Sequence, residues 1–333
     1  MVTDRRDRPM RDLRISVTDR CSFRCGYCMP REIYDNHEYL ERSSILTYGE
    51  IRRITRLTTD LGVRKVRLTG GEPLLRSKVH RLVEMLASID EVEDLAMTTN
   101  ALLLAREAER LKEAGLDRVT VSLDAIDDDL FRKMIDTDIP VAIVFEAIDV
   151  ANDVGLDPIK INTVVRRGWN EDEVVKLVDR FRGTGHTVRF IEFMDVGTTN
   201  SWNLDEVVPS AELVDRIAQK WEIEPLDSGY RGEVASRYRF TDGGGEVGFI
   251  SSVSSPFCGD CTRLRLSAEG KLYTCLFGSK GTDLRTPLRS DASDDEIRDL
   301  IEQTWVHRDD RYSELRGGTP LGVPKVEMSY IGG

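Results

Sequence analysis

The sequence contains few histidines and no long apolar run. It has only four histidines, none of them near a group of cysteines, so a mixed Cys/His zinc site gains no support. No stretch approaches the roughly 20 apolar residues of a membrane span, and residues 1–14 carry charges of both signs without an apolar signal segment. We therefore expect a cytoplasmic protein that has no membrane partner.

The sequence also has no excess of basic over acidic residues. The 333 residues include 59 acidic and 47 basic side chains, which gives a net charge of -12. This charge argues against binding to nucleic acid or to an anionic membrane, so an anionic ligand would need a local cluster of basic residues. Only 10 of the basic residues are lysines, and an acidic surface rich in arginine is what we expect of a chain that works at high salt.

The six cysteines form two groups of three: Cys21, Cys25 and Cys28, then Cys258, Cys261 and Cys275. A group of three cannot pair internally into disulfides, and disulfides between the groups would need an oxidising compartment. In a cytosolic chain such groups indicate metal binding. A zinc site would favour C-x2-C pairs and a fourth ligand, which neither group supplies in full.

Apolar runs alternate with amphipathic stretches over the first 193 residues. The expected strands are 13–17, 66–69, 95–98, 118–123, 159–165 and 188–193. The expected helices are 48–61, 78–89, 104–114, 141–154 and 172–181. About six β-α units predict an α/β fold with a parallel sheet, and the lack of a clear seventh unit favours an incomplete, open TIM-type barrel. The carboxyl ends of the strands then share one face, where barrel active sites lie.

The pattern changes from about residue 201. Residues 202–209 are typical of a loop, 210–221 of a helix and 242–245 of a turn. We interpret residues 1–200 as the partial barrel and residues 201–333 as a C-terminal subdomain that carries the second group of cysteines and ends in Gly-Gly.

The first cysteine group follows the first expected strand with the spacing C-x3-C-x2-C. A [4Fe–4S] cluster takes four thiolates, so three of them leave one iron open to a small molecule. The segment resembles the signature of radical S-adenosylmethionine enzymes, and the resemblance implies contacts to that cofactor from Tyr27, Gly71, Ser122 and Met194. From the residues alone, segment 69–73 is an ordinary turn, and Met194 could equally be a core residue.

The second group has the spacing C-x2-C-x13-C, and Arg263 and Arg265 alternate just after its second cysteine. The two groups together resemble the GTP 3',8-cyclase family over nearly the whole chain. The resemblance implies a second [4Fe–4S] cluster that holds the guanine of GTP, and it implies GTP contacts from Arg14, Arg67, Thr98, Lys160, Arg263 and Arg265. Arginine forks suit a triphosphate, although each basic residue alone would more often be an ion-pair partner or a solvated charge.

The same resemblance implies a reaction and its partners. An adenosyl radical would abstract the ribose 3' hydrogen, and the C3' radical would attack guanine C8. Delivery of one electron and one proton would then give (8S)-3',8-cyclo-7,8-dihydroguanosine 5'-triphosphate, in the first step of molybdenum cofactor biosynthesis. Arg14, Gly332 and Gly333 would be catalytic. An electron donor, a downstream cyclic pyranopterin monophosphate synthase and a homodimer partner are implied as well. The alternatives are a radical maturase of peptides or proteins, and a zinc-stabilised interaction protein.

Four places depart from the family pattern. Asn is usual at Ser22 and at Thr262, Gly is usual at Ala101, and a Gly-Arg pair is usual within residues 136–138, which here are Asp-Thr-Asp. Because residues other than Gly avoid positive φ, we expect a different local turn at Ala101.

Overall fold

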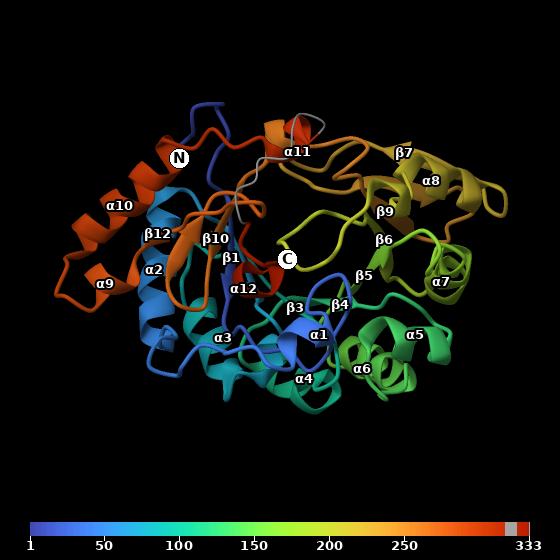
Figure 1. The fold of residues 1–333 in the computed structure, drawn as a ribbon, viewed down its shortest axis with the longest axis horizontal. Helices are drawn as coiled ribbons and strands as arrows, with labels where there is room; N and C mark the ends of the chain where they lie inside the picture. The colour runs from blue at the N-terminus through green and yellow to red at the C-terminus, as the bar shows by residue number, and fades with distance from the viewer. Residues whose placement is uncertain (317–324, 333) are drawn as a thin grey trace.

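A computed structural model of the chain describes residues 1–316 and 325–332. In this part of the chain a single sheet of 12 strands curves around the centre of the molecule, and helices cover its outer side (Figure 1). The strand order is β12-β11-β10-β1-β2-β3-β4-β5-β6-β9-β8-β7. The middle of the sheet therefore comes from the first 200 residues, and both of its edges come from later ones.

The six middle strands are parallel and follow one another in chain order. They are β1 (Asp12–Ser16), β2 (Lys65–Thr69), β3 (Asp94–Thr99), β4 (Arg118–Ser122), β5 (Lys160–Val165) and β6 (Thr187–Glu192). Each overlaps one of the six strands expected from the sequence. Parallel neighbours in chain order need a helical crossover between them, so the open barrel of about six β-α units is confirmed.

The crossover helices are α2 (Tyr48–Leu61), α3 (Val79–Ala87), α4 (Leu104–Glu113), α5 (Asp128–Ile135), α6 (Ala142–Asp153) and α7 (Glu173–Phe181), and the short α1 (Arg31–Tyr34) follows the first cysteines. A capping box between Thr47 and Glu50 fixes the start of α2. The sequence analysis missed α5. The start of α5 could nevertheless have been predicted from the sequence, because Asp127 is an ordinary N-cap residue, and its side chain accepts a hydrogen bond from the Leu130 amide.

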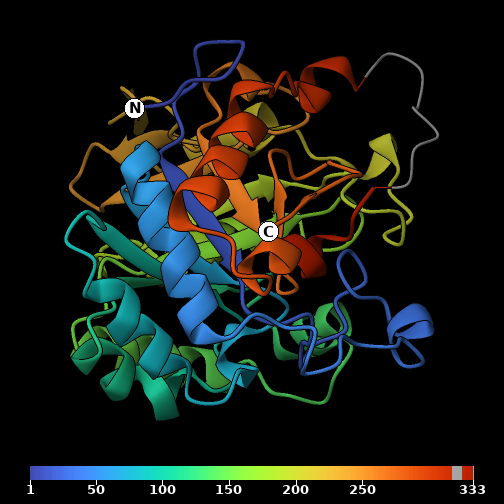
Figure 2. The same cartoon turned by 90° about the vertical axis from the view of Figure 1, so that its left-hand side faces the viewer.

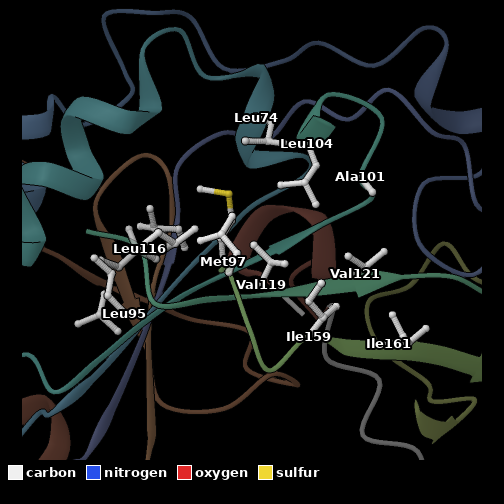
Figure 3. Close-up of a cluster of buried hydrophobic side chains, with 14 of the residues drawn as sticks. Leu74, Leu95, Met97, Ala101, Leu104, Leu116, Val119, Val121, Ile159 and Ile161 are labelled. Carbon is white, nitrogen blue, oxygen red and sulfur yellow. The ribbon is translucent and has the colours of Figure 1, made fainter. Parts of the chain in front are cut away.

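Side chains alternate along the middle strands between an apolar outer face and a polar inner face. Leu13 and Ile15 of β1 are fully buried under the helices, whereas Arg14 between them faces a cavity inside the barrel. Figure 3 shows the outer face of β3, β4 and β5, where Met97 and Val119 lie near Leu104 of α4 and Ile161 lies near Val121. The outer face stabilises the fold through apolar burial, which leaves the inner face free to bind a ligand.

The C-terminal part extends both edges of the sheet. β10 (Arg263–Leu266) pairs in parallel with β1, and β9 (Glu246–Ile250) pairs in parallel with β6. Outside them lie β11 (Lys271–Tyr273), β12 (Thr282–Asp283), β8 (Ser236–Phe240) and β7 (Ile223–Leu226). A division of the chain near residue 200 stays a prediction, since the sheet itself continues across it.

The C-terminal helices are α8 (Ser210–Ala218), α9 (Arg285–Leu288), α10 (Asp294–Val306), α11 (Tyr312–Leu315) and α12 (Met328–Ile331). Short 3-10 turns are η1 (Pro73–Leu75), η2 (Leu204–Glu206) and η3 (Cys258–Asp260). Helix α10 packs beside α2 (Figure 2), where Arg53 forms a 2.6 Å ion pair with Asp294. The helix expected over residues 210–221 is confirmed as α8.

Ala101 corrects one expectation. It has φ +68, so the turn after β3 keeps the left-handed backbone that glycine normally supplies, and the Ala101 side chain is fully buried. A left-handed residue other than glycine costs roughly 1–2 kcal/mol. At the other three places that depart from the family pattern, the side chain present forms a polar contact. Ser22 accepts a hydrogen bond from Asn100 at 2.9 Å, and Thr262 donates one to Asp12. Asp136, at φ 48, forms an ion pair with Arg31.

An Ala101→Gly variant is expected to change the free energy of unfolding by less than about 1 kcal/mol, because relief of the left-handed strain offsets glycine's extra chain entropy and the lost methyl group. Ala108→Gly is the matched control, since Ala108 is equally buried but lies inside α4. There the same exchange should cost at least about 1 kcal/mol. Equal losses in urea unfolding of the two variants would contradict the strain at Ala101.

Candidate functional site

Two cavities lie end to end inside the barrel. The carboxyl-end cavity is lined by the first cysteine group and the carboxyl ends of the strands, and it extends along β10 to the second cysteine group at the start of that strand. The amino-end cavity is lined by the first residues of the strands, among them Lys65, Asp94, Arg118 and Lys160. Both cavities share five residues: Arg14, Arg67, Arg189, Val234 and Arg263. An elongated ligand that starts at the first cysteine group and reaches toward the amino ends of the strands would therefore pass four arginines.

The first cysteine group lies on the loop after β1. Asn100 donates to Cys21 Sγ at 3.8 Å, and the Phe23 amide donates to the same sulfur at 3.5 Å. Burial raises the pKa of the Cys21 thiol to about 11 and also raises the pKa values of Cys25 and Cys28. Three buried thiols beside one another are poor proton acids but good ligands once a metal displaces their protons.

The second cysteine group lies around the start of β10. Burial would raise the pKa of Cys261, but the positive charges of Arg263 and Arg308 lower it to about 6. Arg263 donates to Cys261 Sγ from Nε at 3.3 Å and from Nη2 at 3.2 Å. In both groups N–H donors face a sulfur, which is the environment that tunes iron–sulfur clusters. No group of three or more His, Cys, Asp or Glu within residues 1–316 and 325–332 is arranged to hold a single metal ion.

The residues expected to contact S-adenosylmethionine, Tyr27, Gly71, Ser122 and Met194, all line the carboxyl-end cavity together with the first cysteine group. The Tyr27 hydroxyl donates to Asp124 at 2.7 Å. A Cβ atom on Gly71 would lie 2.2 Å from the Arg20 carbonyl oxygen, so only glycine lets this turn approach the cysteine loop closely. A role of segment 69–73 in binding S-adenosylmethionine stays a prediction.

Glu72 joins that turn to the end of β3. Its buried carboxylate accepts hydrogen bonds from the Asn100 amide at 2.7 Å, the Thr99 hydroxyl at 2.8 Å and the Leu74 amide at 3.0 Å. Burial raises the pKa of Glu72 to about 7 in spite of these donors. The sequence analysis did not single out Glu72, because only the fold shows that its partners lie on a different strand.

The residues expected to contact GTP fall into both cavities. Arg14, Arg67, Thr98, Arg263 and Arg265 line the carboxyl-end cavity, and Lys160 lies in the amino-end cavity with Arg14, Arg67 and Arg263. The sequence analysis missed Arg118 and Arg189. Both occupy inward positions of the same strand alternation, so the period of two could have identified them.

These cations repel one another. Burial and the charges of Arg265, Arg67 and Arg263 hold the pKa of Arg14 well below its ordinary value. Burial, followed by its arginine neighbours, lowers the pKa of Lys160 to about 7, of Arg189 to about 9 and of Arg265 to about 9. A guanidinium nevertheless stays protonated in proteins, so the direction of these shifts reports electrostatic crowding. An anion with several charges would relieve it.

Several buried polar atoms on the inner face have no hydrogen-bond partner among the described residues: Thr98 Oγ1, Thr120 Oγ1, Asn162 Oδ1, and Nε and Nη2 of Arg189. Unpaired buried polar groups are costly and therefore rare. Their position on the barrel interior indicates that a polar ligand supplies the missing hydrogen bonds.

The C-terminal tail reaches the barrel, and α12 lies near the centre of the molecule in Figure 1. Arg265 donates to the Gly332 carbonyl oxygen. Gly332 has φ +76, and a Cβ atom there would lie 2.2 Å from Thr69 Cγ2. Gly332 thus lies beside Arg265 and Thr69 of the barrel strands. Gly333, which was expected to act with it, lies outside the described residues.

Comparison with known proteins agrees with this arrangement. Residues 15–181 match the radical SAM superfamily, and residues 186–314 match Molybdenum Cofactor Synthesis C. The chain is 51% identical to a GTP 3',8-cyclase of Acidothermus cellulolyticus, which it matches over 100% of its own length and 99% of the relative's. It is 50% identical to that of Xanthomonas axonopodis and 44% identical to that of Staphylococcus epidermidis, again over 100% of this chain and 99% of each relative.

Among solved structures, Streptococcus suis SuiB bound to S-adenosylmethionine superposes with a TM-score of 0.62 and 16% identity, covering 97% of this chain and 76% of SuiB. At this identity the likeness concerns the fold alone. Within the described residues, no helix is both long and apolar enough to cross a membrane. The full-length identity to the cyclases decides the assignment: the chain belongs to the GTP 3',8-cyclase family of the radical SAM superfamily.

Proposed function

We propose that the chain converts GTP to (8S)-3',8-cyclo-7,8-dihydroguanosine 5'-triphosphate, the first step of molybdenum cofactor biosynthesis. The observation that carries the proposal is the barrel interior, whose walls carry both cysteine groups and a set of crowded cations. A peptide substrate without a cluster of acidic groups would leave these partly or fully buried positive charges uncompensated, and each of them costs desolvation energy unless an anion compensates it.

The two cysteine groups fit one [4Fe–4S] cluster each. Each supplies three thiol ligands at a cavity wall, and N–H groups face Cys21 and Cys261. When bound, the first cluster and S-adenosylmethionine supply a 5'-deoxyadenosyl radical. Around that cofactor, we assign Gly71 to its methionine end because the glycine turn leaves backbone groups accessible, and we assign Tyr27, Ser122 and Met194 to further contacts.

Arg14, Arg67, Lys160, Arg263 and Arg265 would bind GTP, with Thr98 as a hydrogen-bonding partner. We add Arg189, whose buried Nε and Nη2 have no partner among the described residues. Guanidinium forks fix phosphate oxygens in two directions, so these residues would hold the nucleotide rigidly while its ribose and base react. Arg14, at the boundary between the two cavities, and the Gly332–Gly333 end of the tail would lie closest to the reacting part.

The deciding experiment is an anaerobic incubation of the reconstituted, dithionite-reduced protein with S-adenosylmethionine and GTP, ATP or no nucleotide. GTP alone should strongly increase the formation of 5'-deoxyadenosine and should be consumed in step with it. Cleavage that proceeds at one rate in all three incubations would contradict the proposed substrate and would favour a radical maturase. An electron donor and a downstream synthase, as proposed partners, need separate tests.

Lys160 should take up a proton when GTP binds. Its pKa of about 7 in the ligand-free protein means that the side chain is mostly neutral at pH 8, and a triphosphate beside it would restore the charge. GTP affinity should therefore fall as the pH rises from about 7.5 to 9, by at most about tenfold per pH unit. Calorimetry at pH 8 in two buffers of different ionisation enthalpy measures the uptake.

Lys160→Gln is the control for this measurement, because it should bind GTP more weakly but with little proton uptake. The same linkage has a consequence for stability. In the ligand-free protein the folded pKa of Lys160 is lower than the ordinary 10.5, so its contribution makes the free energy of unfolding rise with pH between about 7 and 10.5. Equal proton uptake by wild type and Lys160→Gln would show that another group titrates.

A further inference from the structure

A buried ionic network behind the second cysteine group has no role in the assignments above. It consists of Asp4 and Arg8 near the N-terminus and Arg308 after α10, with exposed fractions of 5%, 0% and 4%. Arg8 Nε donates to Asp4 Oδ2 at 2.6 Å, and Arg308 Nη1 lies 3.4 Å from the same oxygen. Asp4 thus joins two guanidiniums, and the partly exposed Asp310 carboxylate lies 3.4 Å from Arg308 Nε. The part of the network that is closed to solvent therefore holds two positive charges and one negative charge.

Both arginines hold the backbone of the cysteine loop. Arg8 Nη1 donates to the Cys258 carbonyl oxygen at 2.8 Å and to the Asp310 carbonyl oxygen at 2.7 Å. Arg308 Nη1 donates to the Cys261 carbonyl oxygen at 2.7 Å. The indole of Trp305 donates to the Arg8 carbonyl oxygen at 3.0 Å, which holds the N-terminal segment in place. The position of Cys258 therefore depends on a segment 250 residues away in the chain, and that of Cys261 on Arg308, 47 residues away.

Arg8 also retains an unused donor. Its side chain lines the carboxyl-end cavity together with Cys258, Cys261 and Cys275. Its Nη2 is buried and has no hydrogen-bond partner in residues 1–316 and 325–332. A fully buried guanidinium nitrogen without a partner is costly, and its location on this wall indicates that the partner is the group which the cysteines bind.

We propose that Arg8 is a positioning residue that fixes the second cysteine loop and, through its charge and free N–H, favours the reduced state of the cluster bound there. Adding one electron adds one negative charge, and a buried cation near it stabilises that charge more than solvent-exposed charges would. The inference rests on the proposed second cluster. It gives the N-terminal segment, which precedes the barrel, a direct effect on the active site.

The test is a redox titration of the reconstituted full chain, followed by electron paramagnetic resonance, with dithionite as the one-electron reductant. A Cys21→Ala/Cys25→Ala/Cys28→Ala variant identifies the signal of the second cluster. In Arg8→Gln the ratio of reduced to oxidised second cluster at a fixed potential should fall about tenfold, which is 59 mV for one electron. The first cluster in the same sample should keep its midpoint.

Two further variants separate this role from general damage to the fold. Asp4→Asn removes the negative charge and keeps both arginines, so the reduced fraction of the second cluster should rise rather than fall. Arg6→Gln is the matched control, because Arg6 lies in the same segment but forms an ion pair with Asp309 that is partly exposed to solvent; it should change nothing.

The outcomes are distinct. Shifts of opposite sign in Arg8→Gln and Asp4→Asn support the proposal, and if Arg8→Gln fails to fold, a rise in Asp4→Asn alone supports it. An unchanged midpoint in variants that retain full iron content overturns it, as does a fall in both. Wild-type protein that binds only one cluster would instead contradict the proposed function itself.

Discussion

An Arg265→Ala variant is expected to bind GTP at least about a hundredfold more weakly than the wild-type chain, while it continues to cleave S-adenosylmethionine without substrate. Arg265 is buried, faces the cavity and belongs to the crowded set of cations. A hydrogen bond to a charged group contributes about 1.5–3 kcal/mol, and the loss of a guanidinium fork removes two of them. Equilibrium binding of GTP to the anaerobic protein measures the loss.

Arg265 also contacts Gly332, so a second variant is needed to isolate the anion site. Arg67→Gln serves this purpose, because the structure gives Arg67 no hydrogen bond to the described cysteines or tail residues, and a similar loss of affinity is expected. Arg239→Ala is the control: Arg239 pairs with Glu224 on the exposed edge of the sheet. If Arg265→Ala and Arg67→Gln both retain wild-type affinity, the cations inside the barrel do not bind the triphosphate.

Gly332→Ala is expected to reduce formation of the cyclised product by more than about a hundredfold with both clusters still bound. The added methyl group would overlap Thr69 Cγ2, and the backbone at Gly332 has φ +76, which alanine adopts only at a cost of roughly 1–2 kcal/mol. The tail must then leave its position beside Arg265. Product analysis, together with iron content and 5'-deoxyadenosine formation, separates a loss of cyclisation from a loss of the radical chemistry.

A compensating change tests the steric cause. Thr69→Ser removes the methyl group that the new Cβ would meet and keeps the hydroxyl, so Gly332→Ala/Thr69→Ser should regain part of the lost activity. Gly49→Ala is the control, because Gly49 lies in α2 and a Cβ atom there meets nothing closer than 4.0 Å. A fully active Gly332→Ala variant would mean that the tail position in the structure is not needed for the reaction.

The sequence predicted the middle of the fold well because its signals are local. Capping residues, glycine stops and apolar periodicity are set by the physics of single elements, and they placed all six parallel strands and five of the six long crossover helices. The exception, α5, is only eight residues long and lies in a polar stretch. Short strands such as β12, which has two residues, give no periodic pattern at all.

Site prediction depended on a different kind of information. The cysteine spacings and the resemblance identified expected ligands far apart in the chain, and the structure places the expected residues other than Gly332 and Gly333 on two adjoining cavities. Arg189, Glu72 and Arg8 were missed because each resembles an ordinary charge until its neighbours are known. At Ala101 a general rule about positive φ was wrong, because the surrounding core keeps the backbone in that conformation despite the cost.

By itself, the amino-acid sequence determined that this protein builds parallel β-α units with apolar outer faces, and that it carries two metal-binding cysteine groups. Only the tertiary structure decided that the C-terminal strands extend both edges of the sheet, that cysteines and arginines line one interior, and that Gly332 contacts Arg265 there. The physical reason is that strand alternation and capping act over a few residues, whereas pairing between β1 and β10, or between Arg8 and the Cys258 loop, joins residues about 250 positions apart. Such contacts depend on the whole chain finding its lowest free energy.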